Sequence, residues 1–266
     1  MDVLNTRHIF KLLTGMILIS LFAHTQVFAI GTESGTTVNN TATVSYTVGG
    51  VTQSVDSDGV TGTTGHQQTA FTVDSKIDHL LTVTAVNQGV DAGQDLSDPA
   101  NPSPNPPVLH EFTLTNEGNV DTFYTLDVAN PSGDFTVGDY VIYIDNGDST
   151  FDPATDTLVG DNAAVTLTTA LEHDSGSNEL TVFVATTVLP TQGPGDVSNL
   201  ALIATATDAS GSILVESGAN TLDGVEIVFA DGNGGPANAT DVDFDAIYAL
   251  DFTVTVNASL LTVVKD

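Results

Sequence analysis

The sequence predicts an all-β protein: an antiparallel β-sandwich of the Ig-like or jelly-roll type, with long acidic loops. Three observations carry this prediction. Almost every ordered-looking segment alternates apolar and polar residues with period two and is rich in Val, Thr, Phe and Tyr. No segment has the spacing of an amphipathic helix. Turn signals separate many short strands, a pattern typical of sandwiches.

The first 29 residues predict a secretory signal peptide. Arg7 and Lys11 form a positive n-region, residues 12–22 an apolar core, and Val27-Phe28-Ala29 a small-residue cleavage site. An uncleaved N-terminal anchor is the alternative. We therefore expect residues 30–266 to form a secreted β-sandwich domain on a bacterial surface or outside the cell. The chain has no cysteine, which excludes disulfides.

Charge limits the partners of the mature chain. Cleavage after Ala29 leaves two of the four basic residues and 33 of the 34 acidic ones, a formal charge of −31. Such a surface repels nucleic acid and anionic membranes, so neither is expected as a partner. The acidic residues are 27 Asp and only 7 Glu. Short Asp side chains in turns favour cation coordination, and adaptation to a salty habitat is the alternative explanation.

The first half of the mature chain predicts a hairpin followed by two strands. The first strand separates two kinds of side chain on its faces: Ala42, Val44, Tyr46 and Val48 against Thr43, Ser45 and Thr47. Gly49-Gly50 predicts a two-residue turn into a strand from Val51, because glycine tolerates positive φ. The next strands contain Phe71 and Val73, and then Leu81, Val83 and Ala85.

Residues 91–107 interrupt this pattern with five of the ten prolines. Proline cannot donate to a β-ladder, so this stretch predicts an exposed loop or linker. It could divide two small domains, or it could be a long surface loop within one sandwich, the interpretation that we prefer.

The second half predicts a further series of strands. They contain Phe112 and Leu114; Tyr124, Leu126 and Val128; residues 141–144; residues 181–189; residues 200–207; and residues 227–229. The last predicted strand spans residues 252–264, in which Phe252, Val254 and Val256 alternate before Leu260 to Val264.

An acidic loop follows the strand at residues 141–144 and is the best candidate site. Its four carboxylates are Asp145, Asp148, Asp152 and Asp156, with a glycine and a proline between them. Carboxylates converging on one turn suit calcium, a hard cation that takes oxygen ligands. The spacing departs from the EF-hand register, so we expect either a different kind of calcium turn or a solvated hairpin loop.

A second acidic cluster is a weaker candidate for calcium. It comprises Asp231, Asp241, Asp243 and Asp245. The last three alternate, so on a strand they would share one face, where their mutual repulsion favours a cation. A solvated loop is the preferred alternative.

Several segments together resemble a family of bacterial secreted proteins, the surface proteins with conserved-repeat Ig-like domains of unknown function. The resemblance lies in Asn40-Thr-Ala-Thr-Val-Ser-Tyr46, Phe112-Thr-Leu-Thr-Asn-Glu-Gly-Asn119, the Tyr-Ile-Asp loop, Val182-Phe-Val184 and Val228-Phe-Ala-Asp231. It implies an exported, envelope-associated Ig-like protein without known catalysis. A looser analogy of size, export and strand content links the chain to camelysin-like biofilm fibre subunits.

No constellation of residues predicts catalysis, so we expect no enzyme and no catalytic residue. Tryptophan is absent, there is no Gly-x-Ser-x-Gly motif, and no thiol is available. Four histidines remain after cleavage, without the spacing of a zinc helix, and we expect each at the surface or at a strand edge: His66, His79, His110 and His173.

These observations favour a structural function. We expect a calcium-stabilised subunit of an extracellular fibre, matrix or surface layer, self-associating through sheet edges or through the C-terminal strand 252–264. The alternative is a monomeric adhesin or a glycan- or peptide-binding sandwich.

Overall fold

The computed structural model describes residues 31–40, 42–56, 69–87, 108–137, 139–174, 176–187, 191–218, 224–230 and 244–256. The chain divides into two compact units, residues 1–30 and residues 31–266, and all described residues belong to the second. The described residues form strands and turns without any helix, which confirms the all-β prediction. Accordingly, no helix in this part of the chain is long and apolar enough to cross a membrane.

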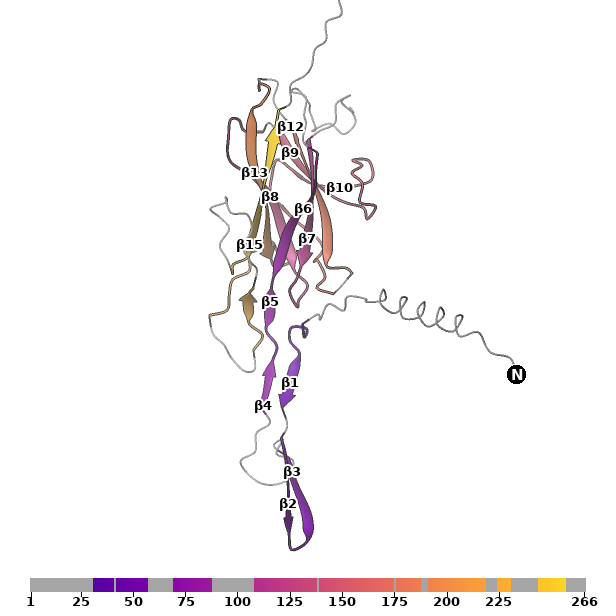
Figure 1. The fold of residues 1–266 in the computed structure, drawn as a ribbon, viewed down its shortest axis with the longest axis vertical. Coiled ribbons are helices and arrows are strands. Elements are labelled where there is room, and N and C mark those ends of the chain that lie inside the picture. Colours follow the sequence, from indigo (N-terminus) through magenta and orange to yellow (C-terminus); the bar gives the residue numbers. More distant parts are fainter. Residues whose placement is uncertain are drawn as a thin grey trace, which may run out of the picture. The chain divides into compact units, whose positions relative to one another are not determined.

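Two antiparallel sheets form the sandwich (Figure 1). The larger sheet has five strands, in the order β10 (Thr157–Asp161), β9 (Asp139–Ile144), β12 (Glu179–Thr187), β7 (Val108–Asn116) and β6 (His79–Asn87). The smaller has four, in the order β11 (Val165–Thr166), β8 (Phe123–Gly133), β13 (Val197–Thr207) and β15 (Ile247–Thr255).

Three pairs of strands lie outside these two sheets. β1 (Thr37–Asn40) pairs antiparallel with β4 (Thr69–Thr72), β2 (Thr43–Val48) forms a hairpin with β3 (Val51–Asp56), and β5 (Ser75–Ile77) runs parallel to β14 (Ile227–Phe229). Asn119, in the turn between β7 and β8, connects β5 to the sandwich: its Oδ1 accepts the N–H of Lys76 at 2.7 Å, and its own N–H donates to the Lys76 carbonyl at 3.2 Å.

Alternation explains why these residues form strands. Along β7, the strand predicted around Phe112 and Leu114, the buried and half-buried positions alternate without interruption, so these two side chains face inward. On β8, Tyr124, Leu126 and Val128 are likewise buried. The predicted Gly-Gly hairpin is confirmed, because Gly49 and Gly50 join β2 to β3 with φ values of 62° and 85°.

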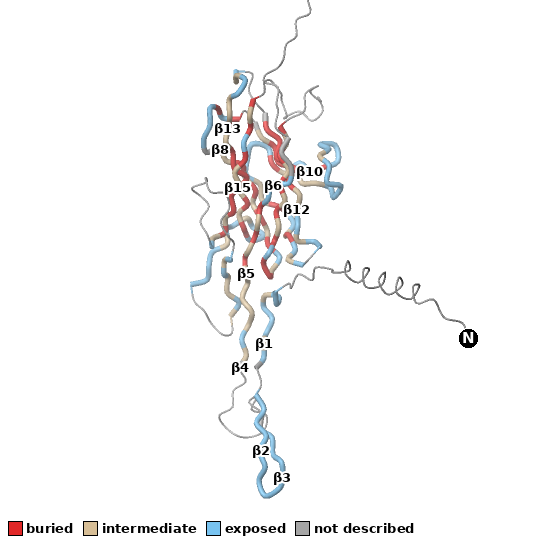
Figure 2. The backbone as a smooth tube through the Cα atoms, in the orientation of Figure 1, coloured by how far each residue is buried: buried red, intermediate tan, exposed pale blue. Residues whose placement is uncertain are grey.

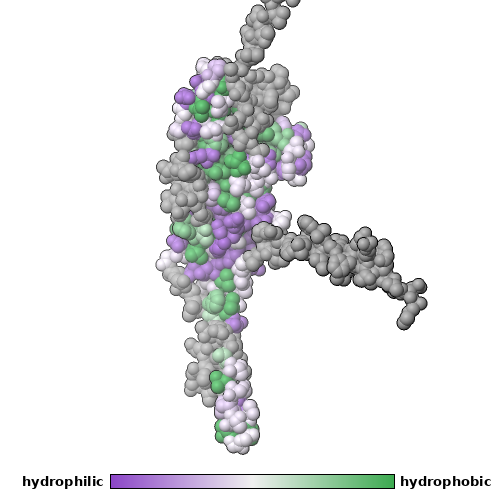
Figure 3. Space-filling view, in the orientation of Figure 1, coloured by the Kyte–Doolittle hydropathy of each residue, from purple (hydrophilic) through white to green (hydrophobic). Residues whose placement is uncertain are grey.

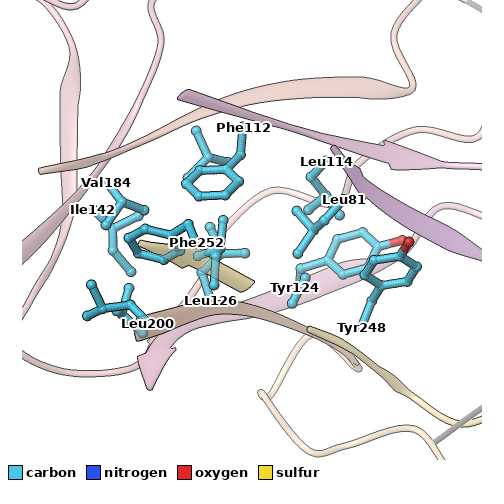
Figure 4. Packing of buried hydrophobic residues seen from close by; sticks show 14 of the residues in the cluster. Leu81, Phe112, Leu114, Tyr124, Leu126, Ile142, Val184, Leu200, Tyr248 and Phe252 are labelled. Atoms are coloured by element: carbon cyan, nitrogen blue, oxygen red, sulfur yellow. The ribbon is translucent and has the colours of Figure 1, made fainter. Parts of the chain in front are cut away.

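The inward faces of the two sheets form one apolar core (Figures 2 and 4). Phe112 on β7 packs against Phe252 on β15, with ring centroids 5.3 Å apart and an edge-on geometry. Each fully buried aromatic or aliphatic side chain of this kind stabilises a fold by roughly 1.5–3 kcal/mol. The residues labelled in Figure 4 come from both sheets: Leu81, Phe112, Leu114, Tyr124, Leu126, Ile142, Val184, Leu200, Tyr248 and Phe252.

Some predictions lie outside the described residues. These are the signal peptide, the proline-rich stretch 91–107, and the C-terminal part of the last predicted strand from residue 257. The strands on either side of the proline-rich stretch, β6 and β7, pair with each other antiparallel, so it connects two neighbours of one sheet.

Candidate functional site

The acidic loop connects β9 to β10, two antiparallel neighbours at one edge of the five-stranded sheet. β9 ends at Ile144 and β10 begins at Thr157, so all four predicted carboxylates lie in the connection. The bend is sharp because Gly147 adopts a φ of 103° and Ser149 a φ of 58°. The loop is therefore a tightly turned hairpin connection.

Three of the four carboxylates stabilise turns within the loop. Asp145 Oδ2 accepts the N–H groups of Gly147 at 3.0 Å and Ser149 at 3.1 Å. Asp148 and Asp152 do the same locally: the Oδ1 of each accepts the N–H two residues later at 2.9 Å. Short acidic side chains that bond the backbone two residues on are typical turn formers.

Asp156 has a different role, because it closes the loop. Its Oδ1 accepts the N–H of Asn146 at 3.2 Å, and its Oδ2 accepts the N–H of Asp152 at 2.8 Å. Its own N–H donates to the Asp152 carbonyl at 2.8 Å. With only 8% of its surface exposed, Asp156 is a buried carboxylate that joins the start, middle and end of the loop.

An aromatic side chain anchors the loop to the sheet. Phe151 packs edge-on against Tyr143 of β9 and Phe183 of β12, with centroid separations of 5.3 Å and 5.4 Å. Together with Val141 and Ala185 these residues form a small apolar cluster separate from the main core. The loop thus contributes to packing as well as carrying charge.

The arrangement of the carboxylates decides how well calcium fits the loop. Among the described residues, no group of three or more Asp, Glu, His or Cys side chains is arranged to hold a metal ion. The four carboxylates instead accept backbone N–H groups, although the Oδ1 of Asp145 is buried without a hydrogen-bond partner. Calcium takes six to eight oxygen ligands, so binding here requires these carboxylates to turn toward the ion. The calcium site stays a prediction.

The second acidic cluster is only partly described. Asp231, Asp241 and Asp243 lie outside the described residues. Asp245 precedes β15, and its Oδ1 accepts the N–H of Ile247 at 2.6 Å. This hydrogen bond lies at the first residue of β15. The cation predicted for the cluster stays a prediction.

Two histidines contradict the expectation of a surface or strand-edge position. His79 and His110 are 1% and 0% exposed, and each ring points between the sheets. Burial lowers the pKa of both imidazoles to about 4. His110, Phe112 and Leu114 are spaced two residues apart and therefore share one face of β7, so the period-two pattern itself places His110 inward.

His173 is the third described histidine. Its Nδ1 lies 2.7 Å from Asp121 Oδ1, and this hydrogen bond lowers the pKa of the Asp121 carboxyl. His66 lies outside the described residues. A partly exposed pair of this kind contributes little to stability.

The fold and the loop place the chain in a broad class, the all-β sandwich proteins with a hydrogen-bonded acidic loop. No protein-family model matches the chain, and no curated protein matches it significantly. The resemblance to conserved-repeat Ig-like surface proteins therefore stays a prediction.

Distantly similar solved structures include AvmM and AggA. AvmM is described as catalysing macrocyclization in alchivemycin A biosynthesis. Its sequence is 12% identical, the match covers 73% of this chain and 95% of AvmM, and the TM-score is 0.30. AggA is the major subunit of aggregative adherence fimbriae type I from Escherichia coli. Its sequence is 13% identical, the match covers 69% of this chain and 99% of AggA, and the TM-score is 0.27. At TM-scores this low, neither likeness bears on function.

Proposed function

We propose that this protein is a secreted, non-catalytic structural subunit of a bacterial extracellular fibre, matrix or surface layer. Subunits associate through the edges of their sheets, and calcium stabilises the acidic loops. The predicted export signal, the all-β fold and the Asp-rich turns all support this function.

The edge strand β15 is the observation that carries the proposal. It pairs with β13 over nine residues without a register shift, and no other described strand pairs with it. Of the other edge strands of the two sandwich sheets, β6 and β10 contain bulges and β11 has two residues. Bulges and short length protect a sheet edge from pairing with other chains, whereas a long regular edge favours it. β15 is thus the best edge for strand addition.

Charge makes the assembly dependent on cations. Two mature chains, each with a formal charge of −31, repel one another unless counterions screen or bind them. Calcium bound in the loops lowers this repulsion and orders the connection after β9. Calcium removal should therefore release subunits.

A monomeric adhesin or a glycan- or peptide-binding module is the alternative. Sugar and peptide sites generally need a platform of exposed aromatic side chains. Within the described residues the exposed aromatic side chains are Tyr46, Phe71 and Phe244, which come from three separate segments. This distribution favours the structural function.

Sedimentation velocity of residues 30–266 tests the proposal, first with calcium and then with excess chelator. Large species that form with calcium and dissolve in chelator support it. Deleting residues 260–266 leaves β15 in place, so the large species should persist if the edge of β15 forms the contact. Their loss would mean that the residues after β15 form it instead. An unchanged compact monomer in both conditions contradicts the proposal and favours the binding module.

A further inference from the structure

The hairpin β2–β3 has two chemically different faces. Residues directly opposite each other in an antiparallel pair lie on the same side of the sheet. Tyr46 pairs with Gln53 and Val48 with Val51, whereas Thr47 pairs with Thr52. One face is therefore mainly apolar, with Val44, Tyr46, Val48 and Val51 beside one polar residue, Gln53. The other face carries the hydroxyl side chains of Thr43, Ser45, Thr47, Thr52 and Ser54.

The apolar face is open to solvent. Its exposed fractions are 62% for Val44, 48% for Tyr46, 62% for Val48 and 59% for Val51. A two-stranded hairpin is at best marginally stable alone in water, and an exposed apolar face marks an interaction site. The Gly49-Gly50 turn nevertheless fixes this hairpin in register. Its sequence therefore suits a surface that a partner covers.

Charge indicates what the partner is. Residues 34–55 contain no charged side chain, the longest such run in a chain with 34 acidic residues. A cationic partner would be drawn to the acidic surface instead of to this segment. A second, equally acidic copy experiences the least repulsion where both copies are uncharged. The matching surface on that copy is the same hairpin.

Hydropathy over the molecule supports this choice. Figure 3 draws the hairpin mainly in white and green, whereas the hydrophilic purple residues gather over the sandwich. In a symmetric pair, a surface that binds its own copy is self-complementary. The Val and Tyr side chains of one hairpin can pack on those of another without leaving a buried charge.

We propose that the apolar face of β2–β3 packs against the same face of a second copy of this chain. The inference rests on the proposed function and names one of its contacts. A fibre needs two contacts on each subunit, and the hairpin and the β15 edge are two different surfaces. Tyr46 lies in the middle of the apolar face, so it sits close to the symmetry axis.

The size of the face sets the strength of the contact. Its four side chains offer roughly 400 Å² per copy, about half of what a standard-size interface buries on each partner. The isolated pair is therefore weak and depends on protein concentration. In an assembly, the second contact raises the effective concentration of hairpins and stabilises the pair.

A pair of matched substitutions tests the hairpin. Tyr46→Asp places a charge on the apolar face, and Thr47→Asp places the same charge on the hydroxyl face of the same strand. Sedimentation equilibrium over a range of concentrations should show association of the parent and of Thr47→Asp. Tyr46→Asp should weaken it at least about tenfold, because buried aromatic side chains dominate such contacts. Circular dichroism checks that the sandwich of both variants is folded.

Cysteine cross-linking tests the geometry independently. The chain has no cysteine, so one introduced thiol is unique. Under mild oxidation Tyr46→Cys should form a disulfide-linked dimer, whereas Thr47→Cys should remain largely monomeric. Equal cross-linking of the two variants overturns the proposed face.

The outcomes separate this inference from the proposed function. If Tyr46→Asp assembles with calcium as the parent does, the hairpin contact is wrong and the structural function stands. If the parent forms only dimers that Tyr46→Asp abolishes, the hairpin contact stands and the fibre is wrong. A parent that is monomeric at every concentration, with no selective cross-link, overturns both.

Discussion

The Nε2 atom of His79 lies 3.3 Å from the backbone carbonyl oxygen of Ala204, so an imidazole on β6 bridges to β13 in the opposite sheet. His110 on β7 repeats this arrangement with the carbonyl of Thr253 on β15, at 3.2 Å. In both rings Nε2 must donate, because its partner is a carbonyl. Nδ1 of each ring is then a buried acceptor without a described partner.

The two buried imidazoles should make folding sensitive to acid. Their pKa is lowered from 6.5 in the unfolded chain to about 4 in the fold, because burial disfavours the charged ring. Above pH 6.5 the rings are neutral in both states, and the fold keeps its full stability. As the pH falls toward 4 the unfolded chain binds protons that the fold does not, so the free energy of unfolding decreases. At pH 5 the loss is about 2 kcal/mol for each histidine.

Urea unfolding followed by circular dichroism between pH 8 and pH 5 measures this loss. Because many carboxylates also titrate, the comparison is with the double variant His79→Gln, His110→Gln, which keeps a polar side chain but does not titrate. The free energy of unfolding should fall more steeply in the parent, by about 4 kcal/mol in total. Parallel pH curves would contradict the prediction.

Replacing Asp156 should destabilise the acidic loop. Asp156→Ala leaves the N–H groups of Asn146 and Asp152 without their acceptor, which costs about 1–3 kcal/mol. Asp148→Ala is the matched control, because Asp148 is exposed and accepts one local bond, so its effect should stay near 0.5 kcal/mol. Chemical denaturation measures both, and equal losses would argue against a closing role for Asp156.

Phe151 should contribute more to stability than its half-buried position in a loop suggests. Phe151→Ala removes the ring that covers Tyr143 and Phe183, and we expect a loss of about 2–3 kcal/mol. Limited proteolysis should then cut the chain between β9 and β10. Phe151→Leu, which keeps most of the apolar contact, should retain protection; a protease-resistant Phe151→Ala would show that the ring does not anchor the loop.

Much of this fold could be predicted from the sequence, because its strands obey a simple alternation. The Gly-Gly turn predicts the β2–β3 hairpin, and the alternation around Phe112 and Tyr124 predicts the strands β7 and β8. Short strands such as β5 and β11 escaped prediction, since two or three residues are too few to show a period. These two strands pair with β14 and β8, whose residues are distant in the sequence.

The candidate site was harder to predict than the fold. Asp156 differs from Asp148 only in being buried and in its distant N–H partners, and no local pattern reveals that. The polarity of histidine predicts a surface position for His110, but His110 lies two residues before Phe112 on the same, inward face of β7. On the inward face of β7, a neutral histidine with one carbonyl partner suits the core.

Glycine is required at position 118 by close packing. A Cβ there would lie 2.4 Å from the Lys76 carbonyl oxygen and 3.0 Å from Asn116 Oδ1. Gly118→Ala must therefore displace β5 from the turn between β7 and β8, and we expect a loss of more than about 2 kcal/mol. Gly218→Ala, which meets no atom within 4 Å, is the control for thermal unfolding, and similar melting temperatures would contradict this account.

Calcium binding at the acidic loop can be separated from general screening of charge. Tyr143 lies beside the loop and the chain has no tryptophan, so tyrosine-sensitised terbium luminescence reports an ion bound there. Calcium should displace terbium, and at one hundred times its dissociation constant it should stabilise the fold by about 2.7 kcal/mol. The double variant Asp145→Asn, Asp148→Asn should lose both effects, whereas Asp196→Asn, outside the loop, should keep them. If sodium chloride at matched ionic strength stabilises the parent as well as calcium does, the charge is only screened and the loop is a hydrogen-bonded hairpin connection.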